Sequence, residues 1–273
     1  MKIAGSMDGV IVNADSMQVY DVLRVLTARP SPEDEALAAH RLYGHVPPGE
    51  SYSTGRWLDD VESVLADDAI AGRPLVFVGG TGLYFRALTQ GLSPMPAIPD
   101  AVRTGMRARL AEEGAAALHR VLAARDPRAA ATLRPGDGQR IVRALEVHEV
   151  SGRSILDWQA ETGTPLIEAD DAERYLVLPE RDTLYANIET RFDMMVEAGA
   201  LDEARALLAL DLDPSLPAMK AIGVREFADA LAGRCAMDEA VARAKTATRQ
   251  YAKRQMTWFR NQLGEGWRRV ERP

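Results

Sequence analysis

Two short apolar runs, each ending in a polar or glycine-rich loop, constrain the fold of this chain more than any other feature of its sequence. The first run, Val10–Ala14, leads into Asp15, and the second, Pro74–Val78, leads into Gly79-Gly80-Thr81-Gly82. Short continuous apolar runs are typical of strands that are buried on both faces, as the strands of parallel sheets are. The two runs therefore predict buried strands of a parallel sheet.

A helix is expected between these strands. Residues 51–71 can form one that ends at Gly72, because glycine suits the position after a helix C-terminus. One face of this helix carries Trp57, Val61, Val64 and Leu65. A further helix is expected from about Leu83. Strand, helix, strand and helix in this order predict an α/β core built on a parallel sheet.

The pattern changes after Pro94. Between about residues 101 and 163 the chain is rich in Ala, Leu and Arg and is expected to be almost wholly helical. We interpret residues 95–163 as a helical insertion and residues 1–94 with 164–273 as the α/β core. Within that core, Tyr175–Leu178 is expected to form a third strand, and helices are expected to run to about Leu263.

Composition limits the setting in which the chain works. No run approaches the roughly 20 apolar residues that a membrane-spanning helix needs, so no membrane partner is expected. The single cysteine, Cys235, fits a reducing cytoplasm and a small buried or half-buried side chain. The four histidines have no Cys or His partners at zinc spacing. We expect a cytoplasmic monomer.

Charge is distributed unevenly. The net charge is −7 overall, yet residues 241–273 carry +7 and the rest of the chain −14. A local basic surface attracts a phosphate backbone even on an acidic protein, because charge is screened over about 10 Å. The tail therefore indicates either nucleic-acid binding or a solvated basic helix.

Asp15 and the glycine loop are the first candidates for chemistry. In open α/β sheets, ligands bind outside the carboxyl ends of the strands, where Asp15 could serve as a general base. Asp is also a common N-cap residue. Glycines at 79, 80 and 82 could bring backbone N–H groups close to an anion, or could simply form a tight turn.

Several cations are the next candidates. On a helix over residues 247–260, Arg249, Lys253 and Arg260 fall beside an apolar face formed by Ala252, Met256, Phe259 and Leu263, which should contact the core. Arg140 and Arg143, next to Gln139, could bind phosphates or pair with Glu146. Lys220 and Arg225 lie on either side of Gly223 and could hold RNA or pyrophosphate.

Taken together and in order, these segments resemble the tRNA dimethylallyltransferase family, also called tRNA isopentenyltransferases. Each motif alone is weak, but the ordered set is specific and covers nearly the whole chain. The matching stretches are Asp15-Ser16-Met17-Gln18-Val19-Tyr20, Thr27-Ala28-Arg29-Pro30, His40-Arg41-Leu42, Gly79-Gly80-Thr81-Gly82-Leu83-Tyr84, Gln139-Arg140-Ile141-Val142-Arg143-Ala144-Leu145-Glu146, Ala221-Ile222-Gly223-Val224-Arg225 and Thr248-Arg249-Gln250-Tyr251-Ala252-Lys253-Arg254-Gln255-Met256-Thr257-Trp258.

The resemblance implies transfer of a dimethylallyl group from its diphosphate to the exocyclic amine of the adenosine 3′ of the tRNA anticodon. It implies a P-loop NTPase-like core, a helical insertion that grips the anticodon stem-loop, and Mg²⁺ on the diphosphate. By the same resemblance Asp15 is the general base and Arg191 binds the diphosphate. The tRNA contacts expected from the resemblance and from the cation pattern are Asp15, Ser16, Met17, Gln18, Thr81, Arg103, Gln139, Arg140, Ile141, Val142, Arg143, Lys220, Arg225, Arg249 and Lys253.

The sequence departs from the family pattern in one respect. The family's phosphate loop, Gly-x-x-x-x-Gly-Lys-Ser/Thr, does not occur in it. A truncated or mis-started chain with little transferase activity is therefore expected, with the first strand of the sheet missing.

Three other functions compete with this interpretation. An adenylate isopentenyltransferase would need neither the insertion nor the basic tail. A non-catalytic RNA-binding remnant would hold tRNA without donor chemistry. A nucleotide kinase would need the phosphate loop and a recognisable lid.

Overall fold

A computed structural model of the protein describes residues 2–264 and 266–271. Its chain divides into two compact units, one formed by Met1–Thr89 with Leu166–Pro273 and the other by Gln90–Pro165. The sequence places the corresponding breaks after residues 94 and 163.

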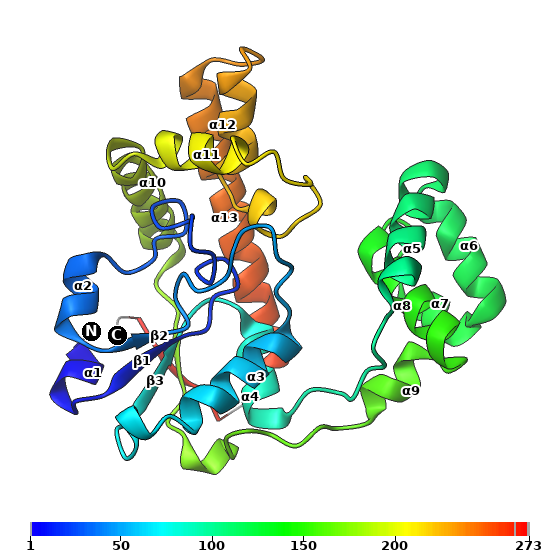
Figure 1. The fold of residues 1–273 in the computed structure, drawn as a ribbon, viewed down its shortest axis with the longest axis horizontal. Coiled ribbons are helices and arrows are strands. Elements are labelled where there is room, and N and C mark those ends of the chain that lie inside the picture. The colour runs from blue at the N-terminus through cyan, green and yellow to red at the C-terminus, as the bar shows by residue number, and fades with distance from the viewer. Residues whose placement is uncertain (1, 265, 272–273) are drawn as a thin grey trace. The chain divides into compact units, whose positions relative to one another are not determined.

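The first unit contains a three-stranded parallel sheet with the order β2-β1-β3 (Figure 1). The strands are β1 (Val10–Asn13), β2 (His40–Arg41) and β3 (Leu75–Val78). Strand β1 lies in the middle, with Val12 opposite Arg41 on one side and Phe77 on the other. All four of its residues are buried, so the expected parallel α/β core is confirmed.

Two expectations about the strands are wrong. Strand β3 is only half buried, and Val78 is 47% exposed, because β3 pairs with β1 along one edge alone. The expected third core strand, β4 (Tyr175–Val177), pairs instead with β5 (Arg268–Val270) in a separate two-stranded parallel sheet. Among the described residues, no strand joins the two sheets.

Helices α1 (Lys2–Ser6), α2 (Pro32–Leu37), α3 (Thr54–Leu65) and α4 (Gly82–Gln90) belong to the N-terminal part of this unit, with a 3-10 turn at Asp68–Ile70. A second 3-10 turn, Ala169–Asp171, begins its C-terminal part. Helix α3 is shorter than expected, because Ser53 caps its start and the chain turns after Leu65. Leu65 was expected on the buried face but is 44% exposed. Trp57 is fully buried and stacks on Tyr84 of α4, with ring centroids 4.4 Å apart.

The C-terminal part of the same unit is helical. It comprises α10 (Arg181–Glu197), α11 (Ala200–Leu208), a 3-10 turn (Ala218–Lys220), α12 (Val224–Leu231) and α13 (Met237–Gln262). Phe192, Leu207 and Phe227 from these helices form one core cluster with Tyr20 and Leu23. The loop that follows β1 is therefore anchored against the C-terminal helices.

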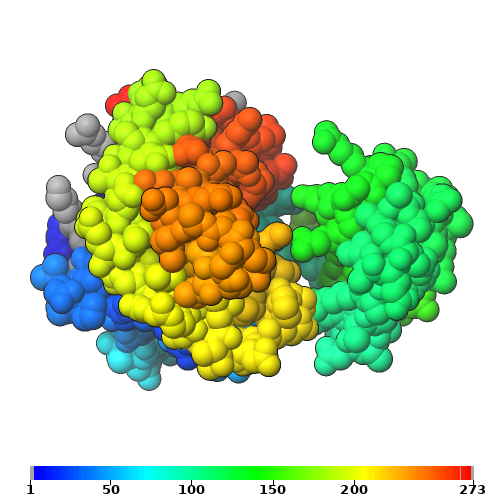
Figure 2. All heavy atoms as spheres, turned by 90° about the horizontal axis from the view of Figure 1, so that it is seen from above, coloured from blue at the N-terminus to red at the C-terminus, as the bar shows by residue number. Residues whose placement is uncertain are grey.

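The second unit consists of α5 (Asp100–Glu113), α6 (Ala115–Arg125), α7 (Pro127–Thr132), α8 (Gly138–Ser151) and α9 (Ile155–Ala160). Its side chains, drawn in green, form one packed body (Figure 2). Leu118, Leu122, Ile141 and Leu145 are completely buried at its centre. The expected helical character of residues 101–163 is confirmed by these five helices.

Candidate active site

Asp15 lies two residues beyond the carboxyl end of β1, in a turn that Asn13 organises. The side chain of Asn13 is fully buried; its Oδ1 accepts from the Asp15 backbone N–H (2.8 Å), and its Nδ2 donates to the carbonyl oxygens of Asp15 (2.9 Å) and Leu42 (3.0 Å). Oδ1 of Asp15 accepts in turn from the N–H of Met17 (2.8 Å). The carboxylate is thus held in one orientation by its own loop.

The glycine loop after β3 is bonded to the Asp15 loop. Oγ1 of Thr81 accepts from the N–H of Ser16 (3.0 Å), and the N–H of Thr81 donates to the carbonyl of Ala14 (3.2 Å). A Cβ on Gly79 would lie 2.1 Å from the carbonyl of Ala14. Glycine is needed here for the close approach of two chain segments.

Helix α13 packs against the other side of this loop. Nε2 of Gln255 donates to the carbonyl of Gly80 (2.9 Å), and a Cβ on Gly82 would lie 2.2 Å from the indole ring of Trp258. The expected core face of this part of α13 needs correction. Ala252, Met256, Phe259 and Leu263 are only half buried, because Gln255 and Trp258 make the contacts with the sheet side of the unit.

Burial changes the acidity of Asp15. Desolvation raises the pKa of its carboxyl above the ordinary aspartate value, and this outweighs the lowering effect of the N–H groups of Met17, Gln18 and Gly80 and of Arg191. A carboxylate with a raised pKa is a stronger proton acceptor than an exposed one. The environment therefore suits a general base.

The charged and aromatic groups around Asp15 come from separate elements. Arg191 of α10 is classed as exposed, and its pKa is lowered by partial desolvation and raised by the charge of Asp15. The charge of Asp15 also adds to burial in raising the pKa of Tyr43, Tyr84 and Tyr251. Sequence reasoning assigned no role to these three tyrosines, because they lie far apart in the chain and no spacing connects them.

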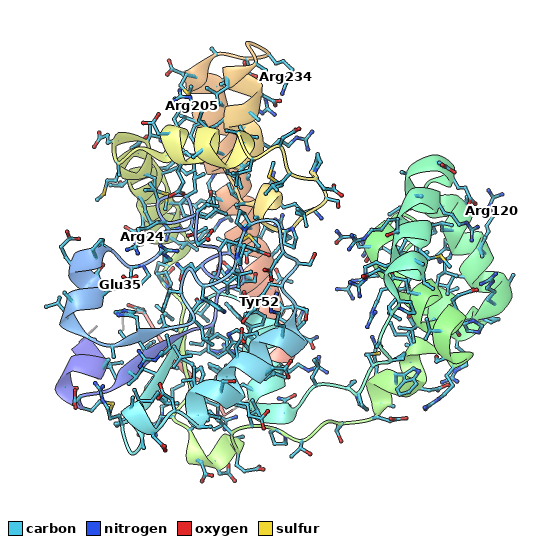
Figure 3. The ribbon with its side chains drawn as sticks, in the orientation of Figure 1. Arg24, Glu35, Tyr52, Arg120, Arg205 and Arg234 are labelled. Carbon is cyan, nitrogen blue, oxygen red and sulfur yellow. The ribbon has the colours of Figure 1, made fainter. Side chains whose placement is uncertain are left out.

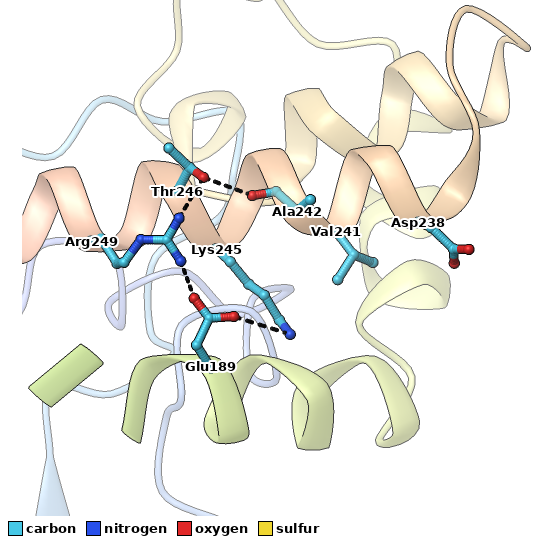
Figure 4. Close-up of a pocket in the computed structure, with 7 residues that line it drawn as sticks. All are labelled: Glu189, Asp238, Val241, Ala242, Lys245, Thr246 and Arg249. Carbon is cyan, nitrogen blue, oxygen red and sulfur yellow. Dashed lines mark hydrogen bonds and ion pairs between the residues drawn. The ribbon is translucent and has the colours of Figure 1, made fainter. Parts of the chain in front are cut away.

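The cations expected on α13 differ in their surroundings. Arg249 is ion-paired with Glu189 of α10, and Lys245 bonds the same carboxylate (3.3 Å) and Asp193 (2.6 Å). Glu189, Lys245 and Arg249 line a cavity of 360 Å³ between α10 and α13 (Figure 4). The positive charge there is neutralised within the protein.

Lys253 has no carboxylate partner in the part of the chain that the structure describes. With Arg181, Tyr185 and Arg260 it lines a second cavity of 210 Å³. This cavity carries a net positive charge and could hold a phosphate group. Arg260 was among the cations that helical periodicity placed on this edge of α13, whereas Arg181 escaped notice in the sequence because it belongs to no distinctive motif.

Lys220 and Arg225 are exposed on either side of Gly223, whose φ of 101° requires glycine in practice. Gly223 is also close to Leu26, whose Cδ2 would lie 2.6 Å from a Cβ at position 223. The two cations thus flank a buried turn, and no described contact connects them with Asp15.

The remaining expected tRNA contacts lie in the helical unit. Gln139 and Arg140 are exposed at the start of α8, where Arg140 pairs with Asp137 (3.2 Å). Arg143 is half buried and pairs with Glu146 (3.7 Å), and Arg103 of α5 lies 3.9 Å from Asp100. Two expected contacts belong to the core of this unit instead of its surface: Ile141 is fully buried and Val142 is 6% exposed.

No group of three or more His, Cys, Asp or Glu side chains that could hold a metal ion occurs among the described residues. Mg²⁺ often needs only one or two carboxylates when substrate phosphates supply further oxygens. The donor set is therefore compatible with a metal bound chiefly through a diphosphate. Within the same residues, every helix is too short or too polar to cross a bilayer.

Comparison with known proteins gives consistent results. Residues 18–262 match the family model described as IPP transferase. The chain is 61% identical over 267 residues to the tRNA dimethylallyltransferase of Chelativorans sp. (strain BNC1), covering 98% of this chain and 91% of that protein. The corresponding enzyme of Agrobacterium fabrum is 57% identical over 271 residues, with 99% and 91% coverage.

Two solved structures are also similar. The tRNA isopentenylpyrophosphate transferase of Bacillus halodurans is 32% identical with a TM-score of 0.66, covering 98% of this chain and 84% of that one. A eukaryotic dimethylallyltransferase acting on tRNA has a TM-score of 0.79 at 24% identity, over 94% of this chain and 65% of that one. The latter likeness concerns the fold alone.

Proposed function

The chain belongs to the IPP transferase family, and we propose from this premise that it transfers a dimethylallyl group from dimethylallyl diphosphate to tRNA. The acceptor is the exocyclic amine of the adenosine 3′ of the anticodon. The observation that carries the proposal is a desolvated carboxylate, Asp15, fixed at the carboxyl end of a parallel strand in a chain 61% identical to a tRNA dimethylallyltransferase.

Asp15 accepts the proton of the attacking amine in this mechanism. The amine nitrogen forms a bond to the first carbon of the allyl group, the bond from that carbon to the diphosphate oxygen breaks, and the amine proton passes to Asp15. An adenine amine is a weak nucleophile because its lone pair is delocalised into the ring. A carboxylate within hydrogen-bond reach removes the positive charge that would otherwise build up on it.

Cations stabilise the departing diphosphate. Arg191 is the proposed contact because it lies near enough to Asp15 for each charge to shift the other's pKa. The cavity formed by Arg181, Lys253 and Arg260 provides further positive charge for phosphate groups. Mg²⁺, when bound to the diphosphate, would neutralise part of the charge that develops on the leaving group.

The tRNA must present an extruded base and be held by its backbone. Removing a base from its stack costs a few kcal/mol, which the protein recovers through a pocket and phosphate contacts. We assign the pocket to Ser16, Met17, Gln18 and Thr81, which surround Asp15. We assign the contacts with the tRNA backbone to Arg103, Arg140 and Arg143 with Gln139 in one unit, and to Lys220, Arg225 and Lys253 in the other. We also propose that the protein acts in the cytoplasm and as a monomer.

Acceptor choice tests the proposal. The protein, in excess over acceptor, is incubated with labelled dimethylallyl diphosphate and either tRNA or adenosine monophosphate, and the modified nucleoside is identified by mass. The expected product is one five-carbon unit on the adenosine 3′ of the anticodon, with no transfer to the free nucleotide. Transfer to the free nucleotide alone would show an adenylate isopentenyltransferase, and tRNA binding without transfer would show a non-catalytic RNA-binding protein.

A further inference from the structure

Glu203 accepts three hydrogen bonds from consecutive backbone amides that lie far from it in the sequence. Its Oε2 accepts from the N–H groups of Arg24 (2.8 Å) and Val25 (2.7 Å), and its Oε1 accepts from the N–H of Leu26 (2.8 Å). Glu203 is in the first turn of α11 and is half buried. Three amides that converge on one carboxylate hold it strongly, because each bond is charge-assisted.

The N–H groups of residues 24–26 lie at the beginning of a compact turn formed by residues 24–28. The N–H of Arg29 donates to the carbonyl of Arg24 (2.9 Å), and the N–H of Ala28 donates to that of Val25 (3.0 Å). Ala28 has a φ of 52°, in the left-handed region that non-glycine residues rarely occupy. Such a conformation persists only where surrounding contacts enforce it. Glu203 supplies these contacts at the start of the turn.

Gln18 supplies contacts that hold the other end of the turn. Its Nε2 donates to the carbonyl oxygens of Thr27 (2.9 Å) and Ala28 (3.0 Å). Gln18 is three residues beyond Asp15 in the same loop, where the N–H of the neighbouring Met17 donates to the Asp15 carboxylate (2.8 Å). The turn is therefore a physical link between α11 and the loop that carries Asp15.

The hydrogen bonds and ion pairs of the two arginines near the turn go to groups other than Glu203. Arg24 pairs with Glu35 (3.2 Å) and donates to the carbonyl of Pro30 (2.6 Å); both labelled side chains are visible in Figure 3. Nη1 of Arg29 donates to the carbonyls of Tyr20 (3.1 Å) and Asp21 (3.3 Å). Among the described residues, Glu203 has no ion-pair partner. Its carboxylate accepts hydrogen bonds from the three backbone N–H groups instead.

We propose that Glu203 is a positioning residue for the transfer reaction, acting through the turn at residues 24–28 and Gln18 on the loop that carries Asp15. This inference rests on the proposed function, which it extends to a residue remote from the substrate. Loss of one carboxylate oxygen would free the turn, and Gln18 and Asp15 would then sample orientations that are unproductive for proton transfer.

Glu203→Gln tests the proposal, because it keeps the size of the side chain and removes one of the two acceptor oxygens. At saturating tRNA and donor, the transfer rate per folded molecule is expected to fall about tenfold, which corresponds to about 1.4 kcal/mol of transition-state stabilisation. Asp202→Asn is the matched control: Asp202 is the preceding residue of the same helix, is exposed and, within the described part of the chain, has Arg205 as its ion-pair partner. Its rate should equal that of the wild type.

A double-variant cycle separates positioning from general loss of stability. If Glu203 acts through Gln18, then Glu203→Gln combined with Gln18→Ala should be no slower than the slower single variant. A wild-type rate for Glu203→Gln, or losses that multiply in the double variant, would overturn the proposal.

Amide hydrogen exchange provides a readout that needs no activity. Exchange at residues 24–26 should be faster in Glu203→Gln than in Asp202→Asn, and Gln18→Ala should have the same effect from the other end of the turn. Unchanged exchange in both variants would refute the link, and if Glu203→Gln failed to fold, unchanged exchange in Gln18→Ala alone would refute it. Absence of transfer by the wild type, with the exchange result intact, would count against the proposed function alone.

Discussion

At the scale of single residues, Asp15 is the group on which the account depends. Its buried environment lowers the free energy of unfolding at neutral pH. Desolvation raises the pKa of its carboxyl, so the folded state binds the Asp15 proton more tightly than the unfolded state does. The stability that this proton gives is complete below the ordinary aspartate pKa and is lost as the pH rises through the raised one. At neutral pH the ionised carboxylate therefore destabilises the fold.

Asp15→Asn is accordingly expected to have a higher Tm than the wild type at pH 7. The difference should shrink as the pH falls and vanish below about pH 3.9, the ordinary value for aspartate. Thermal unfolding followed by circular dichroism between pH 3 and pH 8 measures this. Asp59→Asn, on the exposed side of α3, is the control and should show no such pH-dependent gain. A lower Tm for Asp15→Asn at pH 7 would contradict the raised pKa.

The sequence identified Asp15 because a buried strand ends two residues before it, and the resemblance supplied its role. It could not identify Tyr43, Tyr84 and Tyr251, which tertiary structure alone brings near the carboxylate. It also could not show that Arg249 is held by Glu189 while Lys253 has no carboxylate partner among the described residues. Helical periodicity places both cations on one edge of α13, but the partner helix decides which charge is neutralised.

At the scale of elements, the glycine loop is the contact point of three segments. Gly79 faces the end of β1, Gly80 faces Gln255, and Gly82 faces Trp258. None of the three has a positive φ, so what they provide is space for neighbouring segments. From the sequence, an anion-binding loop and a tight structural turn were equally good explanations of these glycines. In the structure, Ala14, Gln255 and Trp258 pack closely against them.

Gly79→Ala should therefore destabilise the first unit. The added Cβ would lie 2.1 Å from backbone atoms of Ala14, which can move only if β1 moves. Overpacking of this kind costs about 1–3 kcal/mol or more, which denaturant unfolding can measure. Gly5→Ala in α1 is the control, because nothing lies within 4 Å of its Cβ position. It should leave stability unchanged or raise it slightly, and an equal loss in both variants would rule out the packing explanation.

Strand pairing was the weaker part of the sequence prediction. Apolar runs identified β1, β3 and β4, but a run gives no information on which strand its backbone pairs with. Strand β4 therefore lies in a second sheet with β5, whose sequence, Arg268–Val270, has too little apolar character to suggest a strand. The two-residue strand β2 is equally hard to detect from sequence.

At the scale of the whole molecule, the chain consists of two units that each have a core. The helical unit packs Leu118, Leu122, Ile141 and Leu145 without help from the other unit. Its ends approach each other, because a Cβ on Gly91 would lie 2.1 Å from the carbonyl of Gly163. The change of composition after Pro94 predicts helices in this part of the chain, since helical periodicity without strands is visible from sequence alone.

A fragment of residues 90–165 is expected to fold independently and to bind the anticodon stem-loop weakly. Circular dichroism should show a cooperative helical melt, and binding should weaken steeply with salt because each phosphate contact releases a counterion. Arg140→Ala in the fragment should reduce the slope of log K against log salt by about one. A fragment without cooperative unfolding would show that the unit depends on the rest of the chain.

The most direct test of Asp15 as general base is the single-turnover rate of dimethylallyl transfer to tRNA by the wild type and by Asp15→Asn, at saturating substrates and near pH 7. Loss of a positioned base is expected to lower this rate about 10²–10⁴-fold, while tRNA affinity is maintained and the Tm is not lowered. Lowering the pH should slow the wild type as Asp15 becomes protonated, with no matching change in the variant. Equal rates for the two proteins would contradict the account.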